Sequence, residues 1–575
     1  MNTTKIALQS GRATLGLIFA LAFATVAAPA RGSETPVASP AAYALPDAGL
    51  GNVHMATSCA PASAARFDRA LALLHNFWYA RALAAFDDVA NSDPQCAIAY
   101  WGAAMTYNHP VWDAPTAADE TAAWAYVQKG LAARETSPRE MLYLQALAAL
   151  YRDGGVGKKS DRDLAYADAM ASAYAAYPDL ETTLFYALSI YGSIPEGNKG
   201  FEKIDKAQAL LAHVYAINPN HPGILHYLIH VNDDPKHAEQ GLPAARAYAV
   251  SAAAVPHAQH MPSHIFSRLG LWAESAATNE NAWRTSEADV KRAGESGAYR
   301  DFHSLNYLQY AYLQLGRFED AKRVTDIISA QYAQTLDKTT APDTPLLQAR
   351  HVRGRTIYAQ PDRVAYGYFD MLVRYIVETK NWSLVDSLPV VAPSRDFRAM
   401  QLQLRTMAAA SRGDAHAARG FAEELAPLAL EPGQQPFAQL IITMQAKEAA
   451  ATAAMAMGKT ADAMADMGAV LAIENGIDSL SQPPYPIVPA HEMIGDMALA
   501  MHDPARAREQ YLAALVRTPG RPMAIYGVAR SSEMLGDRTM AQTYYTAFLA
   551  QWSKADPDLS PIAHAKAYLF GKIAS

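Results

Sequence analysis

The sequence has little of several features that would direct a search for function. Its 575 residues include two cysteines, and neither has the local signature of a catalytic thiol. The 49 basic residues form no dense run and the formal net charge is only -7, so neither nucleic acid nor an anionic membrane surface is expected as a partner. No segment alternates apolar and polar residues as a half-buried strand would. No sheet is therefore predicted.

Long apolar runs are also missing, apart from one near the N-terminus. There Lys5 and Arg12 precede an apolar stretch, and Ala28-Pro29-Ala30 offers a small-residue cleavage site. This is the form of a secretory signal peptide, and the stretch is too short to span a bilayer comfortably. We assign residues 1–30 to the signal and expect a protein without a membrane span that is periplasmic or secreted.

The segment after the signal, residues 31–58, is rich in proline, alanine and serine and is predicted to be a flexible leader. Cys59 and Cys96 follow it, in a compartment where oxidation is permitted. They either close one disulfide or remain two separate buried thiols, because pairing needs a geometry that spacing alone does not supply.

A repeated pattern runs through the chain from about residue 64. Each copy has a turn residue, a small residue five positions later, a bulky residue four further on and an apolar residue three after that. The copies are NFWYARALAAFDDVANSDP (76–94), LGRFEDAKRV (315–324), MGKTADAMADMGAV (457–470), HDPARAREQYLAALVRTP (502–519) and LGDRTMAQTYYTAFL (535–549). This pattern resembles the tetratricopeptide repeat (TPR), which has about 34 residues in two antiparallel helices.

We therefore predict an all-α protein, a TPR-type α-solenoid of antiparallel helix pairs over residues 59–575. The clearest repeats lie near 64–107, 205–330, 398–472 and 488–550. Small residues are expected where paired helices cross, and bulky ones beside them: Ala82, Ala321, Ala463, Ala507 and Ala541, with Phe86, Tyr511 and Tyr545. Glycines are expected in left-handed turns between paired helices: Gly270, Gly316, Gly413, Gly458 and Gly536.

Histidine is concentrated in one part of the chain, in HYLIHVND (226–233) and HAQHMPSHIFSRLG (257–270). The TPR resemblance implies that the first helix of each pair lines a concave groove through its second, fifth and ninth residues. In that frame His226 and His230 take the fifth and ninth places, and Asp233 follows at the twelfth. In the following repeat, the second, fifth and ninth positions are His257, His260 and His264.

The repeat after that places His303, Asn306 and Tyr310 at the same three positions. Neighbouring repeats carry other residues there, so the enrichment is local. Pro262 complicates the helix that bears the central histidines, because proline inside a helix removes a hydrogen bond and clashes with the preceding turn. Either the helix kinks at Pro262 or it begins there, in which case His257 and His260 lie on a loop.

Neutral imidazole is the commonest nitrogen ligand of transition metals, and two on one helical face at i and i+4 can chelate one ion. A four-coordinate site would take His226 and His230 from one helix and His260 and His264 from another, and the wider set of candidate ligands adds His257 and Asp233. Without thiolates nearby, the set favours zinc, copper(II), iron(II) or nickel. Three protein ligands with one open position would acidify a bound water and allow hydrolysis or oxidation.

Further residues are expected around this centre or along the groove, namely His303, Asn306, Tyr310, Arg268 and His237. His75, near the end of another groove-side helix, receives less weight, and His221 is interpreted as a turn residue. The alternative without metal is a groove whose histidines hold a peptide, a protein or a small molecule by hydrogen bonds. We therefore predict an exported TPR-repeat binding protein whose concave groove carries a histidine-rich site for a transition metal. The alternatives are a metal-dependent hydrolase or oxidase that uses the same histidines, and a metal-free protein–protein interaction scaffold. The sequence assigns no catalytic residue.

The strings LHYLIHVNDDP and PHAQHMPSHIFSRLGLW resemble a signature of exported bacterial TPR-repeat proteins, as do FDRALALLHNFWYARALAAF, NHPVW and YLQYAYLQLGR. The resemblance covers nearly the whole mature chain. It implies an exported α-solenoid, and its histidines correspond to His226, His230, His257, His260 and His264. It implies no particular reaction.

Overall fold

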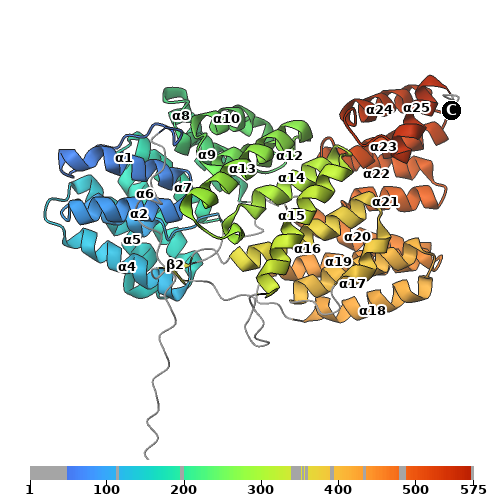
Figure 1. Cartoon of the computed structure of the whole chain (residues 1–575), viewed down its shortest axis with the longest axis horizontal. Coiled ribbons are helices and arrows are strands. Elements are labelled where there is room, and N and C mark those ends of the chain that lie inside the picture. The colour runs from blue at the N-terminus through green and yellow to red at the C-terminus, as the bar shows by residue number, and fades with distance from the viewer. Residues whose placement is uncertain are drawn as a thin grey trace, which may run out of the picture.

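Helices follow one another along almost the whole chain, and each packs against its neighbour in sequence (Figure 1). The computed structural model describes residues 48–111, 115–194, 200–337, 351–352, 355–356, 360–388, 394–431, 436–477 and 487–571. The fold is all-α, a TPR-type α-solenoid of antiparallel helix pairs, as predicted. The predicted signal peptide and the first part of the leader, up to residue 47, lie outside the described residues.

The elements divide into three groups along the chain. The first is α1 (Pro61–His75), α2 (Tyr79–Ser92), α3 (Ala97–Met105), α4 (Ala117–Ala132), α5 (Pro138–Gly155), α6 (Lys159–Ala176) and α7 (Leu180–Gly192). The second is α8 (Phe201–Ile217), α9 (Pro222–Val231), α10 (Ala238–Ser251), α11 (Pro256–His260), α12 (Pro262–Arg268), α13 (Trp272–Ala293), η2 (Gly297–Tyr299), α14 (Phe302–Gln314), α15 (Phe318–Asp337) and α16 (Gln360–Thr379). The third is η3 (Trp382–Ser387), α17 (Arg395–Ser411), α18 (Ala415–Leu430), α19 (Pro436–Ala456), α20 (Thr460–Gly476), α21 (Ala490–Ala500), α22 (Pro504–Arg517), α23 (Pro522–Met534), α24 (Arg538–Gln551) and α25 (Ser560–Phe570).

One strand pairing occurs within the described residues. The two-residue strands β1 (His351–Val352) and β2 (Arg355–Thr356) are antiparallel, with His351 opposite Thr356. The sequence did not predict this short pair. None of the described helices combines the length and the apolar character that crossing a bilayer requires.

The turns within helix pairs confirm the predicted frame. The expected glycines all have positive φ angles, between 68° and 78°: Gly270, Gly316, Gly413, Gly458 and Gly536. In three other turns the residue with positive φ is not a glycine but Phe77, Lys380 or His502. A bulky residue in this region is strained, so Phe77 must be held by what its ring contacts.

The crossing of paired helices depends on small residues beside a large ring. Ala82 is fully buried on α2, and the neighbouring Phe86 lies so close to Gly102 of α3 that a methyl group there would overlap its ring. In the C-terminal repeats, Tyr511 occupies the same role between Gly495 and Gly527. These contacts confirm the predicted roles of the small and bulky positions.

The superhelix is closed by contacts between segments far apart in sequence. On one side Arg81 of α2 forms an ion pair with Asp289 of α13, at 3.0 Å. On the other side the indole nitrogen of Trp272 donates to the carbonyl oxygen of Gly520 at 2.7 Å, across 248 residues. Helix α13 is thereby joined both to the N-terminal repeat and to the turn that precedes α23.

Residues 48–58, assigned by composition to a flexible leader, instead pack against the solenoid. Leu50 and Met55 are each 3% exposed, and the Leu50 carbonyl oxygen accepts a hydrogen bond from Asn76. Just beyond, Cys59 and Cys96 form a disulfide with their Cα atoms 4.4 Å apart. This resolves the choice between one disulfide and two separate thiols.

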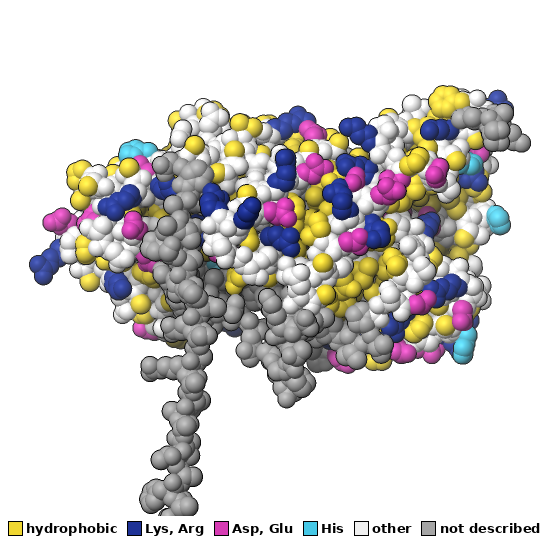
Figure 2. All heavy atoms as spheres, in the orientation of Figure 1, with side chains coloured by type: hydrophobic (Ala, Val, Ile, Leu, Met, Phe, Trp, Pro, Cys, Tyr) yellow, Lys and Arg dark blue, Asp and Glu magenta, His cyan; other side chains and the backbone are white. Residues whose placement is uncertain are grey.

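On the face drawn in Figure 2, basic and acidic side chains of the described residues are intermixed, with apolar atoms between them. Few histidines appear on this face. Most of the histidines that matter for the site are buried inside the solenoid.

Candidate metal centre

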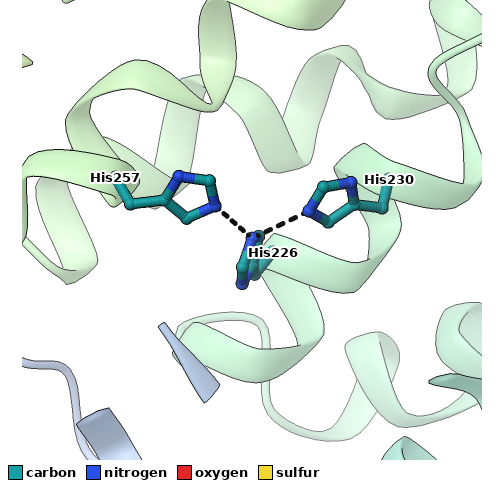
Figure 3. A group of neighbouring side chains, drawn as sticks. All are labelled: His226, His230 and His257. Atoms are coloured by element: carbon teal, nitrogen blue, oxygen red, sulfur yellow. Dashed lines mark hydrogen bonds between the residues drawn. The ribbon is translucent and has the colours of Figure 1, made fainter. Parts of the chain in front are cut away.

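Two groups of three histidines lie next to one another on the inner side of α9, α11, α12 and α14. Trio 1 consists of His226, His230 and His257 (Figure 3). The Nε2 atom of His226 lies 3.0 Å from Nε2 of His230 and 3.1 Å from Nε2 of His257. All three rings turn one nitrogen toward a common point.

Trio 2 consists of His260, His264 and His303. The Nε2 atoms of His260 and His264 lie 3.0 Å apart, and the ring centroid of His303 lies 4.6 Å from the ring centroid of His260. In each trio, one ring nitrogen per residue can be chosen so that all three lie within 4.8 Å of one another. The prediction that neighbouring helices bring these imidazoles together is thus met, but as two sets of three.

Pro262 explains how the central histidines are presented. It begins α12, while the five-residue helix α11 ends at His260, and Met261 lies between the two helices in right-handed helical conformation. His257 and His260 therefore lie on a short helix of their own and not on a loop. His260 and His264, on either side of the junction, still approach each other as an i, i+4 pair.

The cluster is buried, whereas the sequence placed these histidines along a concave groove without indicating burial. The exposed fractions of His226, His230, His260 and His264 are 0, 4, 0 and 6%. His257 and His303, one member of each trio, are partly buried. The reason is the closure of the superhelix, which places the N-terminal repeat against α9.

Phe77 provides part of that cover. Its ring centroid lies 4.3 Å from the His226 ring and 5.5 Å from the His230 ring. The Tyr248 ring also stacks on His226, at 5.1 Å. The contacts of Phe77 with the histidine rings stabilise its strained turn and add to the burial of His226 and His230.

The Nδ1 atoms on the far side of the rings are fixed by hydrogen-bond acceptors. The Nδ1–H group of His226 donates to the His75 carbonyl oxygen at 2.6 Å. That of His260 donates to Asn279 Oδ1 at 2.7 Å, and the Asn279 amide cannot be flipped because its Nδ2 donates to the Ser275 carbonyl oxygen. Such contacts set the tautomer of a histidine and leave Nε2 as the free lone pair.

Asp233 holds the third such ring and is not itself placed as a ligand. Its carboxylate accepts from His264 Nδ1 at 2.8 Å and from Arg268 Nε at 2.8 Å. Burial raises the pKa of Asp233, but the Arg268 guanidinium and the His264 ring outweigh burial and bring the pKa below its ordinary value. Asp233, predicted as a possible ligand, thus belongs to neither trio and contacts His264 and Arg268 instead.

Burial also keeps imidazoles in the cluster neutral. It lowers the pKa of His226 and of His260 to about 3, against the opposing effect of the acceptors on Nδ1. Burial lowers the pKa of His230 and of His257 well below the usual value, and neighbouring histidines add to the effect. Neutral imidazole is the form that binds metal ions.

Three of the remaining predicted residues make their contacts elsewhere. His237 lies between Asp234, at 2.6 Å, and Asp205 of α8, at 3.1 Å, and so is buried near the start of α10 and outside the cluster. Asn306 donates to Asp370, and the Tyr310 hydroxyl accepts from Arg521. Asn306 and Tyr310 thus belong to a buried polar network beyond trio 2.

A third buried group, formed by His75, Glu181 and His221, lies beside trio 1 and received little weight in the sequence analysis. His75 and His221 contact the two carboxylate oxygens of Glu181 at 2.8 and 3.1 Å, and all three residues are buried. Burial raises the pKa of Glu181, but the two histidines outweigh it and lower the pKa to about 2. The group anchors the end of α1, whose His75 carbonyl oxygen positions His226.

Comparison with known proteins adds little to this picture. The sequence matches no protein-family model and no curated protein. Among solved structures, the human IFIT1 dimer with m7Gppp-AAAA is similar at 11% identity, covering 76% of this chain and 87% of that chain, with a TM-score of 0.31. The APC/C hetero-tetramer Cut9–Hcn1 is 10% identical over 75% of this chain and 83% of that chain, with a TM-score of 0.26.

The P58(IPK) TPR domain is 10% identical over 83% of this chain and 99% of that chain, with a TM-score of 0.19. At these scores the likeness says nothing about a ligand. The TPR-type fold of this chain rests on its own helix pairs.

Proposed function

We propose that this chain is an exported TPR-type binding protein whose buried histidine cluster binds a divalent transition metal. The observation that carries the proposal is the convergence of Nε2 atoms in rings whose Nδ1 protons are already engaged.

In trio 2, His260 is neutral with its proton on Nδ1, so its Nε2 is a lone pair. His264 donates its Nδ1 proton to the Asp233 carboxylate, and its Nε2 faces that lone pair at 3.0 Å. Two lone pairs at this distance repel each other. The contact needs a positive centre between the two nitrogens, either a proton or a metal ion.

In trio 1 the same reasoning applies to His226. Its Nδ1 proton is held by a backbone carbonyl, so its Nε2 is a lone pair, and two other rings approach that one atom at 3.0 and 3.1 Å. A proton would join only two nitrogens along one line. Three converging nitrogens are instead the ligand set of a metal ion.

The distances agree with this interpretation. Metal–nitrogen bonds of 2.0–2.1 Å at a tetrahedral angle separate ligand nitrogens by about 3.3 Å. The measured Nε2 separations of 3.0–3.1 Å are within a few tenths of an ångström of that value. Acceptors on Nδ1, here a carbonyl, an amide and a carboxylate oxygen, are the usual support of metal-bound histidine.

The donor set favours zinc, copper, iron(II) or nickel. Both trios offer imidazole nitrogen only, and the two cysteines are joined in a disulfide. Carboxylate-seeking ions such as magnesium and calcium find no oxygen ligand within either trio.

Burial favours a metal over the alternative of a peptide or protein held by the histidines. A partner's side chains cannot reach rings that are 0–6% exposed, whereas an ion can enter past the partly exposed His257 and His303. A second candidate function uses the same centre. Three histidines leave a coordination position open, at which a metal-bound water could serve a hydrolase or oxidase.

Export is the second part of the proposal. The signal-like N-terminus predicts it, and a disulfide between Cys59 and Cys96 suits an oxidising compartment. Expression of the full chain in a Gram-negative host, followed by fractionation and N-terminal sequencing, tests this. A protein processed near residue 30 and found outside the cytoplasm is the expected result.

Metal content tests the main proposal. The untagged protein should carry a stoichiometric transition metal after purification, measured by elemental mass spectrometry. A variant with His230→Ala and His264→Ala should lose it, whereas His416→Ala, on an exposed position of α18, should not. Equal metal content in the wild type and the double variant would end the metal proposal.

A further inference from the structure

The two trios are the same arrangement displaced by one repeat. In the TPR frame, trio 1 uses the fifth and ninth residues of one repeat, His226 and His230, and the second residue of the next, His257. Trio 2 uses the fifth and ninth residues of that next repeat, His260 and His264, and the second residue of the one after it. Each trio is therefore an i, i+4 pair completed by a single ring from the next repeat. In trio 2 the pair spans the junction between α11 and α12.

The series ends on both sides. A further trio before trio 1 would need a histidine at the second place of α9, which is Gly223. The His75 ring lies so close to Gly223 that a Cβ atom added there would overlap the ring. One repeat later, the fifth and ninth places are Asn306 and Tyr310, which belong to the network of Asp370 and Arg521. Within the described residues the frame thus provides two complete sets of three, and only these two.

Each trio gathers its own ring nitrogens. Within each trio, one ring nitrogen per residue lies within 4.8 Å of the other two. The Nε2 contacts of 3.0–3.1 Å join His226 to His230 and to His257 in trio 1, and His260 to His264 in trio 2. The two sets of contacts share no residue, so an ion bound at one set leaves the ligands of the other set unused.

Each trio has its own acceptor for Nδ1. Trio 1 is supported through the His75 carbonyl oxygen at the end of α1. Trio 2 is supported through Asn279 of α13 and through Asp233, which follows α9. Two independently oriented ligand sets are more than a single ion requires.

We propose that the cluster holds two transition-metal ions side by side, one bound by trio 1 and one by trio 2. The inference rests on the proposed function and adds the number of ions and the ligands of each. With three protein ligands apiece, both ions keep a position for a small exogenous ligand such as water or hydroxide. His257 and His303, the partly exposed members, are the rings that such a ligand passes.

The number of bound ions tests the inference. Metal-free full-length protein is equilibrated with Zn²⁺ by dialysis, and bound zinc is measured per chain. The wild type should bind two ions, His257→Ala and His303→Ala one each, and the double variant none with comparable affinity. The His416→Ala control should bind two.

A second measurement uses the wild type alone, so that it does not depend on the folding of any variant. Loaded with Cu²⁺, the two-ion centre should give an electron paramagnetic resonance spectrum with magnetic coupling between neighbouring ions. A single uncoupled copper per chain would overturn the two-ion inference while leaving the proposed function in place. No bound metal of either kind would overturn both.

Discussion

The Nε2 atoms of His260 and His264 lie 3.0 Å apart while both Nδ1 atoms point at acceptors, Asn279 and Asp233. Two buried hydrogen bonds thus orient the Nε2 lone pairs of the two rings toward each other, which is unfavourable when nothing lies between them. A metal ion between the two nitrogens would make the arrangement favourable, since the same hydrogen bonds fix the orientation of the ligands and raise their basicity.

Asp233 should matter for metal affinity without touching the metal. Asp233→Asn removes the charge that faces His264, and affinity for Zn²⁺ should fall by about 10- to 100-fold, as is typical for supporting residues of this kind. The free energy of unfolding should fall as well, because Arg268, whose side chain is 17% exposed, loses its ion pair with Asp233. Competition with a fluorescent chelator measures the affinity.

Asp234→Asn is the matched control. Asp234 is the next residue and equally buried, but it holds His237 outside the cluster. Its zinc affinity should stay within a factor of about two of the wild type. A loss equal to that of Asp233→Asn would mean that affinity depends on general stability and not on the His264 contact.

Phe77 balances backbone strain against ring packing. Phe77→Gly removes a left-handed strain of about 1 kcal/mol, but it also removes a buried ring that contributes about 1.5–3 kcal/mol. Stability should therefore fall by about 0.5–2 kcal/mol in urea unfolding, and zinc should dissociate faster from trio 1. Lys380→Gly, at the equivalent turn of another repeat, relieves the same kind of strain without removing a buried ring. It should raise stability by about 1 kcal/mol and leave zinc dissociation unchanged.

The repeat architecture and the clustering of histidines follow from the sequence because both are local. Turn glycines, small crossing residues and the places of His226, His230, His257, His260 and His264 are set by spacing within one helix pair. The gathering of these rings was therefore predictable. Which rings meet at which point was not, because it depends on how each repeat rotates against the next.

Burial could not be predicted for a related reason. Phe77 and the His75 carbonyl oxygen reach the cluster from about 150 residues away in sequence, through closure of the superhelix. Asp233 was a reasonable ligand by residue type, yet its carboxylate lies on the Nδ1 side of His264, together with Arg268. Only the side-chain directions distinguish a ligand from its support.

The disulfide should stabilise the N-terminal repeats. Cys59 and Cys96 are 37 residues apart, and cross-linking a loop of that length lowers the entropy of the unfolded chain by an amount worth about 4 kcal/mol. The variant Cys59→Ser with Cys96→Ser should lose up to this much stability in urea unfolding while retaining its metal. If the wild type unfolds identically with and without reductant, the disulfide does not form in solution.

Glu448 should make stability depend on pH. Burial raises the pKa of Glu448 well above its ordinary value, and the nearby Glu474 adds to the rise. The folded state therefore keeps a proton that the unfolded state releases, so stability is greatest below the unfolded-state pKa and is lost as pH rises through the folded-state pKa. The slope for one group is at most about 1.4 kcal/mol per pH unit.

Glu448→Gln carries no such proton and should remove this loss. At pH 8 the variant should be more stable than the wild type, and the difference should shrink toward pH 4, as measured by urea unfolding at several pH values. The Gln403 side chain can still donate to the new amide oxygen. A difference that is the same at every pH would show that the carboxyl group does not titrate in this range.

The most direct measurement is anomalous diffraction from crystals of the untagged, zinc-loaded protein, with data collected on both sides of the zinc absorption edge. The account predicts two anomalous peaks, one among the Nε2 atoms of trio 1 and one among the ring nitrogens of trio 2. No peak at the cluster, or zinc bound only to surface residues, would contradict the account.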